Sequence, residues 1–413
     1  MMLINKPLIL TFLFFCLIIS CQAERLEYKP MFVCSNKMDN PYGIVAHISR
    51  KGTDYEFDSI NKALDMIKSV GISNIRVDFD WYTFRNGYTK DSVSFERFDK
   101  MMSAVSEKKI NVLGIISNTN RDQASIWYNH TDLLVRHYKK RVNYWEIVNE
   151  ADLFAKRNQN YKPEDYISIL KDGYRIVKSY DNNIKVLFTS ICDIEYNFMD
   201  ETFANDASSF FDIMNLHAYT DQKEPEILIG FYGLVKNKIK KYGIEKPIWL
   251  TETGYPTKGD NSVSMETQAQ RLPRIFLISF ALGLDKVFWY NSKASETFEE
   301  DRECHFGIFH KDYTPKPAYY AYKTLIQMCP DKSTRPSLFY DEGVYLAKWK
   351  RKDKKNVVAL WTSEGKKDII VKSNKKNEIF DINGKPVFRR GGGMVNVSQS
   401  IIYVVGEKDI IVF

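Results

Sequence analysis

The chain has 413 residues, of which 44% are hydrophobic and 14% aromatic. This length suits one large domain with a smaller one, and this composition excludes an intrinsically disordered chain. The net charge of +7 is not accompanied by a stacking-and-basic motif, so we expect no nucleic-acid partner.

The first residues of the chain predict an export signal. Lys6 precedes an apolar stretch over residues 8–19, which is too short to span a membrane comfortably. The string from Leu17 to Cys21 resembles a bacterial lipobox, which implies a lipoprotein signal peptide over 1–21 and a lipid on Cys21. A plain signal peptide or an uncleaved anchor is the alternative. We therefore expect an exported lipoprotein of the bacterial cell envelope, facing the periplasm or the cell surface and touching the membrane only through its lipid.

Residues 22–330 alternate between strand-like apolar runs and segments of helical period. The predicted strands lie at 42–48, 74–81, 111–118, 143–150, 184–190, 212–219, 247–253 and 286–291. The predicted helices lie at 58–70, 95–108, 132–141, 163–180, 226–242, 265–282 and 317–328. This rhythm predicts an α/β fold, a (β/α)8 TIM barrel, whose continuous apolar strands are covered by helices. A doubly wound open sheet is the competitor, but no glycine-rich phosphate turn follows the first strand.

Residues 331–413 have a different texture. Helical periodicity stops, and short strand-like segments follow at 343–349, 357–361, 368–372, 378–381, 395–397, 401–405 and 410–412. Turn residues such as Asn383-Gly384 separate them. This spacing predicts a small C-terminal antiparallel β-sandwich. We expect it to pack against the barrel, with glycan binding as the other possibility.

Four cysteines remain beyond the signal segment, namely Cys34, Cys192, Cys304 and Cys329. They show neither CxxC pairing nor a histidine spacing typical of zinc. Export permits a disulfide, but free thiols are our default expectation. Asp78 and Asp80 lack the further oxygen ligands that a metal ion needs, and we expect no metal and no cofactor.

Two predicted strands end in glutamates. Strand four ends in Trp145-Glu-Ile-Val-Asn-Glu150, and strand seven ends in Trp249-Leu-Thr-Glu252-Thr. In this type of barrel, catalytic side chains lie at the carboxyl ends of strands. A glutamate that ends an apolar strand is costly without partners, and a structural ion pair is a fair explanation for one such residue but a poor one for two. We therefore predict that Glu150 and Glu252 are catalytic.

These two strings resemble glycoside hydrolase clan A, a large group of retaining barrel glycosidases, and the likeness covers roughly residues 40–330. The resemblance implies that Glu150 is the acid/base and Glu252 the nucleophile. Many members of the clan have proline after the Asn-Glu pair, whereas this chain has Ala151. The family within the clan is therefore not assigned.

Other strand ends offer candidate substrate contacts. Arg76 lies where similar barrels place an arginine against the nucleophile, and Asn149 would bind the sugar 2-hydroxyl. His217 and Tyr219 resemble the His-x-Tyr of the clan, with Tyr219 donating to Glu252. Trp289 on strand eight is expected to form a platform under the sugar, with core packing as its alternative. Weaker candidates for sugar contacts are His47, Asp80, Trp81, Asn118 and Tyr255.

The sequence therefore predicts a monomeric, cofactor-free glycoside hydrolase that cleaves β-linked oligo- or polysaccharides by double displacement. A β-glucan or a related polysaccharide is our preferred substrate, with endo action possible. A non-catalytic carbohydrate-binding barrel and a transglycosylase with the same residues are the alternatives.

Overall fold

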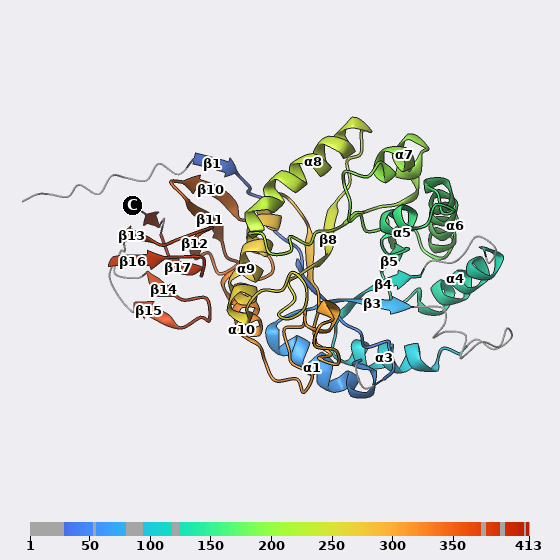
Figure 1. Ribbon diagram of the computed structural model, residues 1–413, viewed down its shortest axis with the longest axis horizontal. Helices are drawn as coiled ribbons and strands as arrows, with labels where there is room; N and C mark the ends of the chain where they lie inside the picture. The colour runs from blue at the N-terminus through green and yellow to red at the C-terminus, as the bar shows by residue number, and fades with distance from the viewer. Residues whose placement is uncertain are drawn as a thin grey trace, which may run out of the picture.

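Eight parallel strands form the centre of the larger part of the computed structural model (Figure 1). The structure describes residues 29–52, 55–79, 94–117, 124–372, 377–388, 393–408 and 410–412. The barrel strands are β2 (Tyr42–Val45), β3 (Asn74–Phe79), β4 (Asn111–Ile116), β5 (Tyr144–Ile147), β6 (Lys185–Leu187), β7 (Met214–His217), β8 (Ile248–Thr253) and β9 (Lys286–Trp289). Their order is β6-β5-β4-β3-β2-β9-β8-β7, and bridges from Leu187 to Ile213 and from Ile191 to Leu216 join β6 to β7. The predicted barrel is thereby confirmed.

Helices surround this barrel (Figure 1). They are α1 (Ile60–Val70), α3 (Glu96–Glu107), α4 (Ala124–Tyr138), α5 (Ala151–Arg157), α6 (Pro163–Tyr180), α7 (Phe198–Ala204), α8 (Leu228–Lys241), α9 (Met265–Ala281) and α10 (Pro317–Met328). Short 3-10 turns are η1 (Phe57–Ser59), η3 (Ala207–Phe210), η4 (Pro225–Ile227) and η5 (Arg302–Cys304). Helix α4 begins eight residues before its predicted start, because Trp127 lies buried there and donates to the carbonyl of Ser117.

Side chains alternate between the inside and the outside of the barrel, as the period of a strand requires. Inside, the buried side chains of Leu113, Leu187, Ile213, Trp249 and Phe288 form a cluster of their own. Gly43 makes room for it, because a Cβ at this position would lie 2.3 Å from the Phe288 ring. This apolar cluster fills the barrel interior. The carboxyl end of the barrel remains available for polar groups.

The C-terminal part consists of two antiparallel sheets. Its strands are β10 (Ser337–Asp341), β11 (Val344–Lys350), β12 (Asn356–Thr362), β13 (Lys367–Lys372), β14 (Glu378–Phe380), β15 (Pro386–Phe388), β16 (Gly393–Val397), β17 (Ile402–Gly406) and β18 (Ile411–Val412). One sheet has the order β1-β10-β11-β12-β17-β14-β15 and the other β16-β13-β18, which confirms the predicted β-sandwich. Strand β1 (Lys29–Phe32), which the sequence analysis did not predict, pairs with β10 from the far end of the chain.

The larger sheet of the sandwich buries both of its faces. On β11, Val344 and Leu346 point into the sandwich, whereas Ala347 and Trp349 belong to the core shared with the barrel. The Trp349 indole donates to the carbonyl of Met328 at the end of α10. The two parts therefore share one continuous core.

In the part of the chain that the structure describes, no helix is long and apolar enough to cross a membrane. The four cysteines considered above are all free thiols there. Cys21 lies outside the described residues.

Candidate active site

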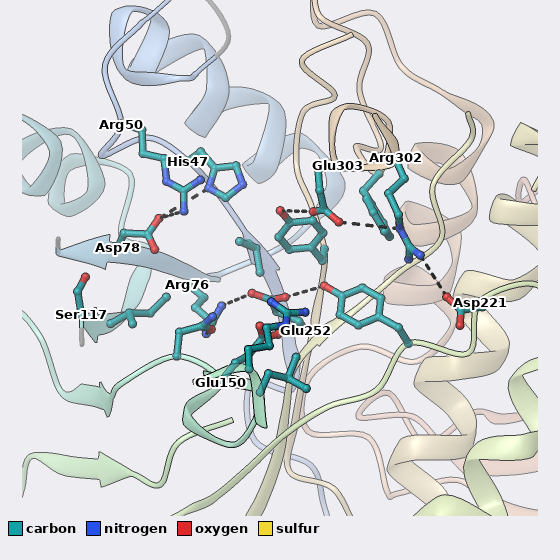
Figure 2. Close-up of a pocket in the computed structure, with 18 residues that line it drawn as sticks. His47, Arg50, Arg76, Asp78, Ser117, Glu150, Asp221, Glu252, Arg302 and Glu303 are labelled. Atoms are coloured by element: carbon teal, nitrogen blue, oxygen red, sulfur yellow. Dashed lines mark hydrogen bonds and ion pairs between the residues drawn. The ribbon is translucent and has the colours of Figure 1, made fainter. Parts of the chain in front are cut away.

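A cavity of about 590 Å³ opens at the carboxyl ends of the barrel strands (Figure 2). Its size falls within the range usual for ligand sites. Its walls contain the two predicted glutamates and, around them, Val45, His47, Arg50, Arg76, Asp78, Ile115, Ser117, Asn149, Leu153, Arg157, Tyr219, Asp221, Tyr290, Arg302, Glu303 and Phe306. The cavity is therefore lined mostly by polar and aromatic groups at the end of the barrel where catalytic residues are expected.

Glu150 lies in a strained turn between β5 and α5. Its φ is 51° and that of Val148 is 69°, a conformation that is unfavourable for residues other than glycine. Hydrogen bonds hold this turn, because the amide of Glu150 donates to Ser190 Oγ (3.0 Å) and that of Ala151 to Thr189 Oγ1 (2.9 Å). A proline in place of Ala151 would lack the second donor. Ala151, where many members of the clan have proline, therefore makes a hydrogen bond that proline could not make.

The Glu150 carboxylate meets two side chains from neighbouring strand ends. Oε1 lies 2.8 Å from His217 Nδ1, and the thiol of Cys192 donates to the same oxygen at 3.1 Å. Burial raises the pKa of Glu150, but the hydrogen bond and charge of His217 more than offset it and lower the pKa to about 2. Burial and the carboxylates of Glu150 and Asp152 raise the pKa of Cys192 well above its usual value, so the thiol keeps its proton.

The far side of the His217 ring is held in the barrel interior. Its Nε2 lies 3.1 Å from Thr251 Oγ1, and Thr251 donates its own proton to Asn215 Oδ1 at 2.5 Å. The Thr251 oxygen is therefore an acceptor for His217, and Nε2 carries a hydrogen. The hydrogen bond between Nδ1 and Glu150 can then have its proton in one of two places. The proton is on Nδ1 in a charged ring, or on the carboxyl group of Glu150 beside a neutral ring.

Glu252 is 8% exposed and has three partners. Arg76 Nη1 donates to Oε1 at 2.5 Å, and the phenol of Tyr219 donates to Oε2 at 2.6 Å. His217 Nδ1 also lies 3.5 Å from Oε2. Burial and the charge of Glu252 raise the pKa of Tyr219 well above its usual value, so this phenol remains a donor.

A fully buried ion pair stands under the two glutamates. Arg76 is 1% exposed and makes two bonds to Glu146, from Nε at 2.8 Å and from Nη2 at 2.9 Å. Nη2 also donates to Asn149 Oδ1 at 2.6 Å. Burial alone would lower the pKa of Arg76, but Glu146 and Glu252 raise it, so Arg76 stays charged. Because the oxygen of Asn149 is occupied, its NH₂ group is the one left to meet a ligand.

Most of the predicted site residues meet in this cavity, namely Glu150, Glu252, Arg76, Asn149, Tyr219 and His47 in its wall and His217 between the two glutamates. His47 lies beside Tyr290, with ring centroids 5.9 Å apart. Asp80, Trp81 and Asn118 lie outside the described residues. Tyr255 is buried and bonds to Thr220, away from the cavity.

Trp289 requires a correction. Its side chain is 0% exposed, belongs to the core that surrounds the barrel and does not line the cavity. The reason is the alternation along β9: Phe288 points into the barrel, so Trp289 points away from it. The next residue, Tyr290, returns to the inner side and lines the cavity in its place.

Sequence reasoning missed Glu146, Cys192 and Tyr290. Glu146 lies within an apolar strand, on the same face as Tyr144. A charge at such a position requires a buried partner, and this was the signal that the sequence offered. Tyr290 could have been found from the alternation of strand eight. No sequence signal pointed to Cys192, which follows the short strand β6 and meets Glu150 because β5 and β6 are neighbours in the barrel.

Among the described residues, one group could hold a metal ion by its geometry. The ligand atoms of Glu150, Cys192 and His217 all lie within 4.8 Å of one another. These atoms already share hydrogen bonds, and the thiol would have to lose its proton to bind a metal. Asp78 is instead paired with Arg50 at 2.8 Å.

Comparison with known proteins agrees with this site. Residues 100–299 match the family model of the glycosyl hydrolase catalytic core, and no curated protein matches the chain by sequence. This range contains both glutamates.

Solved structures share the fold. A family 39 glycoside hydrolase from Bacteroides cellulosilyticus superposes with a TM-score of 0.73 at 19% identity, covering 89% of this chain and 81% of the other. A family 39 β-xylosidase from Caulobacter crescentus gives 0.64 at 14% identity, with 91% and 98% covered. A family 30 endoxylanase from Clostridium papyrosolvens gives 0.61 at 12% identity, with 91% and 98% covered.

Proposed function

We propose that this chain, a glycoside hydrolase of the clan A type, cleaves β-linked glycosides with retention of configuration, using Glu150 as acid/base and Glu252 as nucleophile. The observation that carries this proposal is the position of His217 Nδ1, which lies 2.8 Å from a Glu150 oxygen and 3.5 Å from a Glu252 oxygen.

This shared contact limits the distance between the carboxylates. The sum of the two distances is the largest separation that these oxygens can have, and it is shorter than the about 6.5–9.5 Å of inverting enzymes. The spacing therefore supports direct attack by a carboxylate, which is the retaining mechanism.

The partners of each glutamate support different roles. Glu252 accepts hydrogen bonds from Arg76 and Tyr219, two donors that aim its oxygens. A charged carboxylate in this position can attack the anomeric carbon. We assign the nucleophile to Glu252 for this reason.

Glu150 shares a proton with His217. The lowered pKa of Glu150 belongs to the state in which His217 is charged. When the ring is neutral, its hydrogen is on Nε2 and the proton of the pair is on Glu150, from which it can pass to the leaving oxygen. Once the sugar is attached to Glu252, the charge of that carboxylate is gone. Glu150 can then accept a proton from the incoming water.

We propose a β-linked pyranoside as the substrate. The structural relatives include a β-xylosidase, an endoxylanase and a glucosidase from Croceicoccus marinus, which act on neutral sugars by their names. The preferred polysaccharide remains a β-glucan or a related glycan. We propose that the NH₂ group of Asn149, whose oxygen accepts from Arg76, binds the 2-hydroxyl of such a sugar.

The test uses aryl β-glycosides of glucose, xylose, galactose and mannose together with β-glucan, xylan, mannan and galactan. We expect the wild type to cleave at least one of them and Glu150→Ala and Glu252→Ala to lose most of the activity. Azide should rescue Glu150→Ala with a glycosyl azide of retained configuration and Glu252→Ala with one of inverted configuration. Asp221→Ala removes another carboxylate of the cavity and should form no azide product. Mutants as active as the wild type would disprove the roles assigned to Glu150 and Glu252.

We also propose that a lipid on Cys21 attaches the protein to the cell envelope, as the lipobox-like string Leu17–Cys21 supports. In a bacterial host, the protein should partition into the detergent phase of a Triton X-114 extract. Cys21→Ser should move it to the aqueous phase without changing its activity. Equal partitioning of the two proteins would contradict the anchor.

A further inference from the structure

A second hollow of about 210 Å³ adjoins the catalytic cavity. The two spaces share His47, Arg50, Tyr290 and Glu303 in their walls. The two spaces therefore lie side by side, with these four side chains at their common boundary.

Two exposed aromatic rings flank this hollow. Phe298 is 65% exposed and Tyr55 is 39% exposed, although a ring of this size gains by being covered. The backbone of Phe298 is anchored, because His305 Nε2 lies 3.0 Å from its carbonyl oxygen and His305 is 4% exposed. Tyr55 is held by Arg50, whose guanidinium lies 5.7 Å from its ring centroid. Both rings therefore line the hollow with part of their surface in solvent.

The wall of the hollow contains a buried polar side chain, Asn291. Asn291 is 3% exposed, and its Oδ1 has no hydrogen-bond partner among the described residues. Its Nδ2 lies 3.5 Å from His47 Nε2, a long contact. Aromatic rings beside buried polar groups are the surroundings that suit a sugar, which has apolar faces and hydroxyl edges.

The position of the hollow decides which sugar it holds. The acid must lie on the side of the leaving group, and the cavity wall beside Glu150 comes from α5 with Leu153 and Arg157. The second hollow contains no residue of α5 and is built from the segments after β2 and β9. Figure 2 shows His47 and Glu303 on the opposite side of Glu252 from Glu150.

We propose that this hollow between Tyr55 and Phe298 is a second sugar site, which binds the unit on the non-reducing side of the sugar being cleaved. This inference rests on the proposed glycosidase function and gives it a substrate class. The enzyme acts best on glycans with at least two sugars before the cleaved bond, and it releases disaccharides or longer products in preference to single sugars.

The test compares two aryl β-glycosides with the same leaving group, one of a monosaccharide and one of the corresponding β-1,4-linked disaccharide. Xylose with xylobiose and glucose with cellobiose are the two series, and the sugar cleaved faster is used. Release of the aryl group reports cleavage of the same bond in both. For the wild type we expect kcat/KM to be at least tenfold higher on the disaccharide.

Phe298→Ala should reduce this ratio at least fivefold, while Phe298→Trp, which keeps a flat ring, should preserve it. Tyr340→Ala removes another exposed ring, from the β-sandwich, and is the control, with no change in the ratio. A wild-type ratio of one or less, or a ratio that Phe298→Ala leaves unchanged, would overturn the second sugar site while leaving the proposed function in place. Failure of the wild type on every aryl glycoside and polysaccharide would instead overturn the proposed function.

Discussion

Arg76 is the residue on which the site depends most. It is buried between two carboxylates, Glu146 below and Glu252 above, and it also orients Asn149. Breaking a buried ion pair from one side is far more costly than replacing both partners with apolar groups, because it leaves one charge uncompensated. The same residue therefore supports both the fold and the chemistry.

For Arg76→Ala we expect the free energy of unfolding to fall by about 3–5 kcal/mol, because Glu146 would remain at 0% exposure without its cation. Denaturant unfolding followed by circular dichroism measures this change. The double variant Arg76→Met, Glu146→Leu removes both charges and should recover most of the lost stability. Equal stability of Arg76→Ala and the wild type would contradict the buried pair.

Tyr219→Phe tests the phenol that donates to Glu252. The change removes one hydrogen bond to a charged group, worth about 1.5–3 kcal/mol, and leaves the ring in place. We expect kcat/KM on an aryl glycoside to fall about tenfold to a hundredfold. Tyr290→Phe, whose hydroxyl contacts Glu303 at 3.2 Å, should have a smaller effect. The opposite order of effects would show that Tyr219 does not position Glu252.

At this scale the sequence revealed the glutamates and two donors to Glu252, Arg76 and Tyr219, but not the carboxylate beneath Arg76. Glu150 and Glu252 stand in recognisable strings at strand ends. Glu146 stands in the middle of a strand, and only its pairing with Arg76 from another strand explains why a charge is tolerated there. Contacts across the barrel depend on register between strands, which local sequence does not determine.

At the scale of elements, periodicity predicted much of the fold. All eight barrel strands overlap their predicted ranges, and α6 and α10 agree at both ends. Helices α5 and α7 were missed because each has only seven residues, too few to show a period. Strand β1 was missed because it is defined by pairing with β10, some 300 residues away.

The segment between β2 and α1 contains a buried titratable group. Glu56 is 2% exposed and accepts from Ser292 Oγ at 2.7 Å, and burial raises its pKa to about 7. The folded state therefore holds this proton more tightly than the unfolded chain. Its contribution to stability is complete below about pH 4.5 and is lost as the pH rises to about 7.

For Glu56→Gln we expect stability similar to that of the wild type at pH 4.5. The difference should grow in favour of the variant up to pH 8, reaching at most about 3 kcal/mol for a shift of this size. Denaturant unfolding at pH 4.5, 6 and 8 measures it. A difference that does not depend on pH would show that Glu56 does not titrate in this range.

At the scale of the whole molecule, the β-sandwich is a cover for the barrel. Its larger sheet lies beside helix α9 (Figure 1). Trp349 and Trp361 of this sheet are buried in the core shared with the barrel, and the Trp361 indole donates to Glu226 at 2.7 Å. Glu226 is itself paired with Arg274 from α9. These contacts favour packing over glycan binding as the role of this part.

Trp349→Ala should therefore lower the free energy of unfolding by about 3–5 kcal/mol, the usual cost of removing a large buried ring. Because Trp349 lies far from the cavity, kcat/KM of the folded enzyme on soluble and on polymeric substrate should change together or not at all. A selective loss on polymer with unchanged stability would indicate a glycan-binding role instead.

The most direct test of the account is to trap the covalent intermediate. A 2-deoxy-2-fluoro aryl β-glycoside of the preferred sugar slows hydrolysis of the glycosyl enzyme, so that the labelled protein can be digested and analysed by mass spectrometry. We predict one sugar attached to the peptide that contains Glu252, and none in Glu252→Ala. A label on another residue, or a first-formed product of inverted configuration, would contradict the assignment of Glu252 as the nucleophile of a retaining glycosidase.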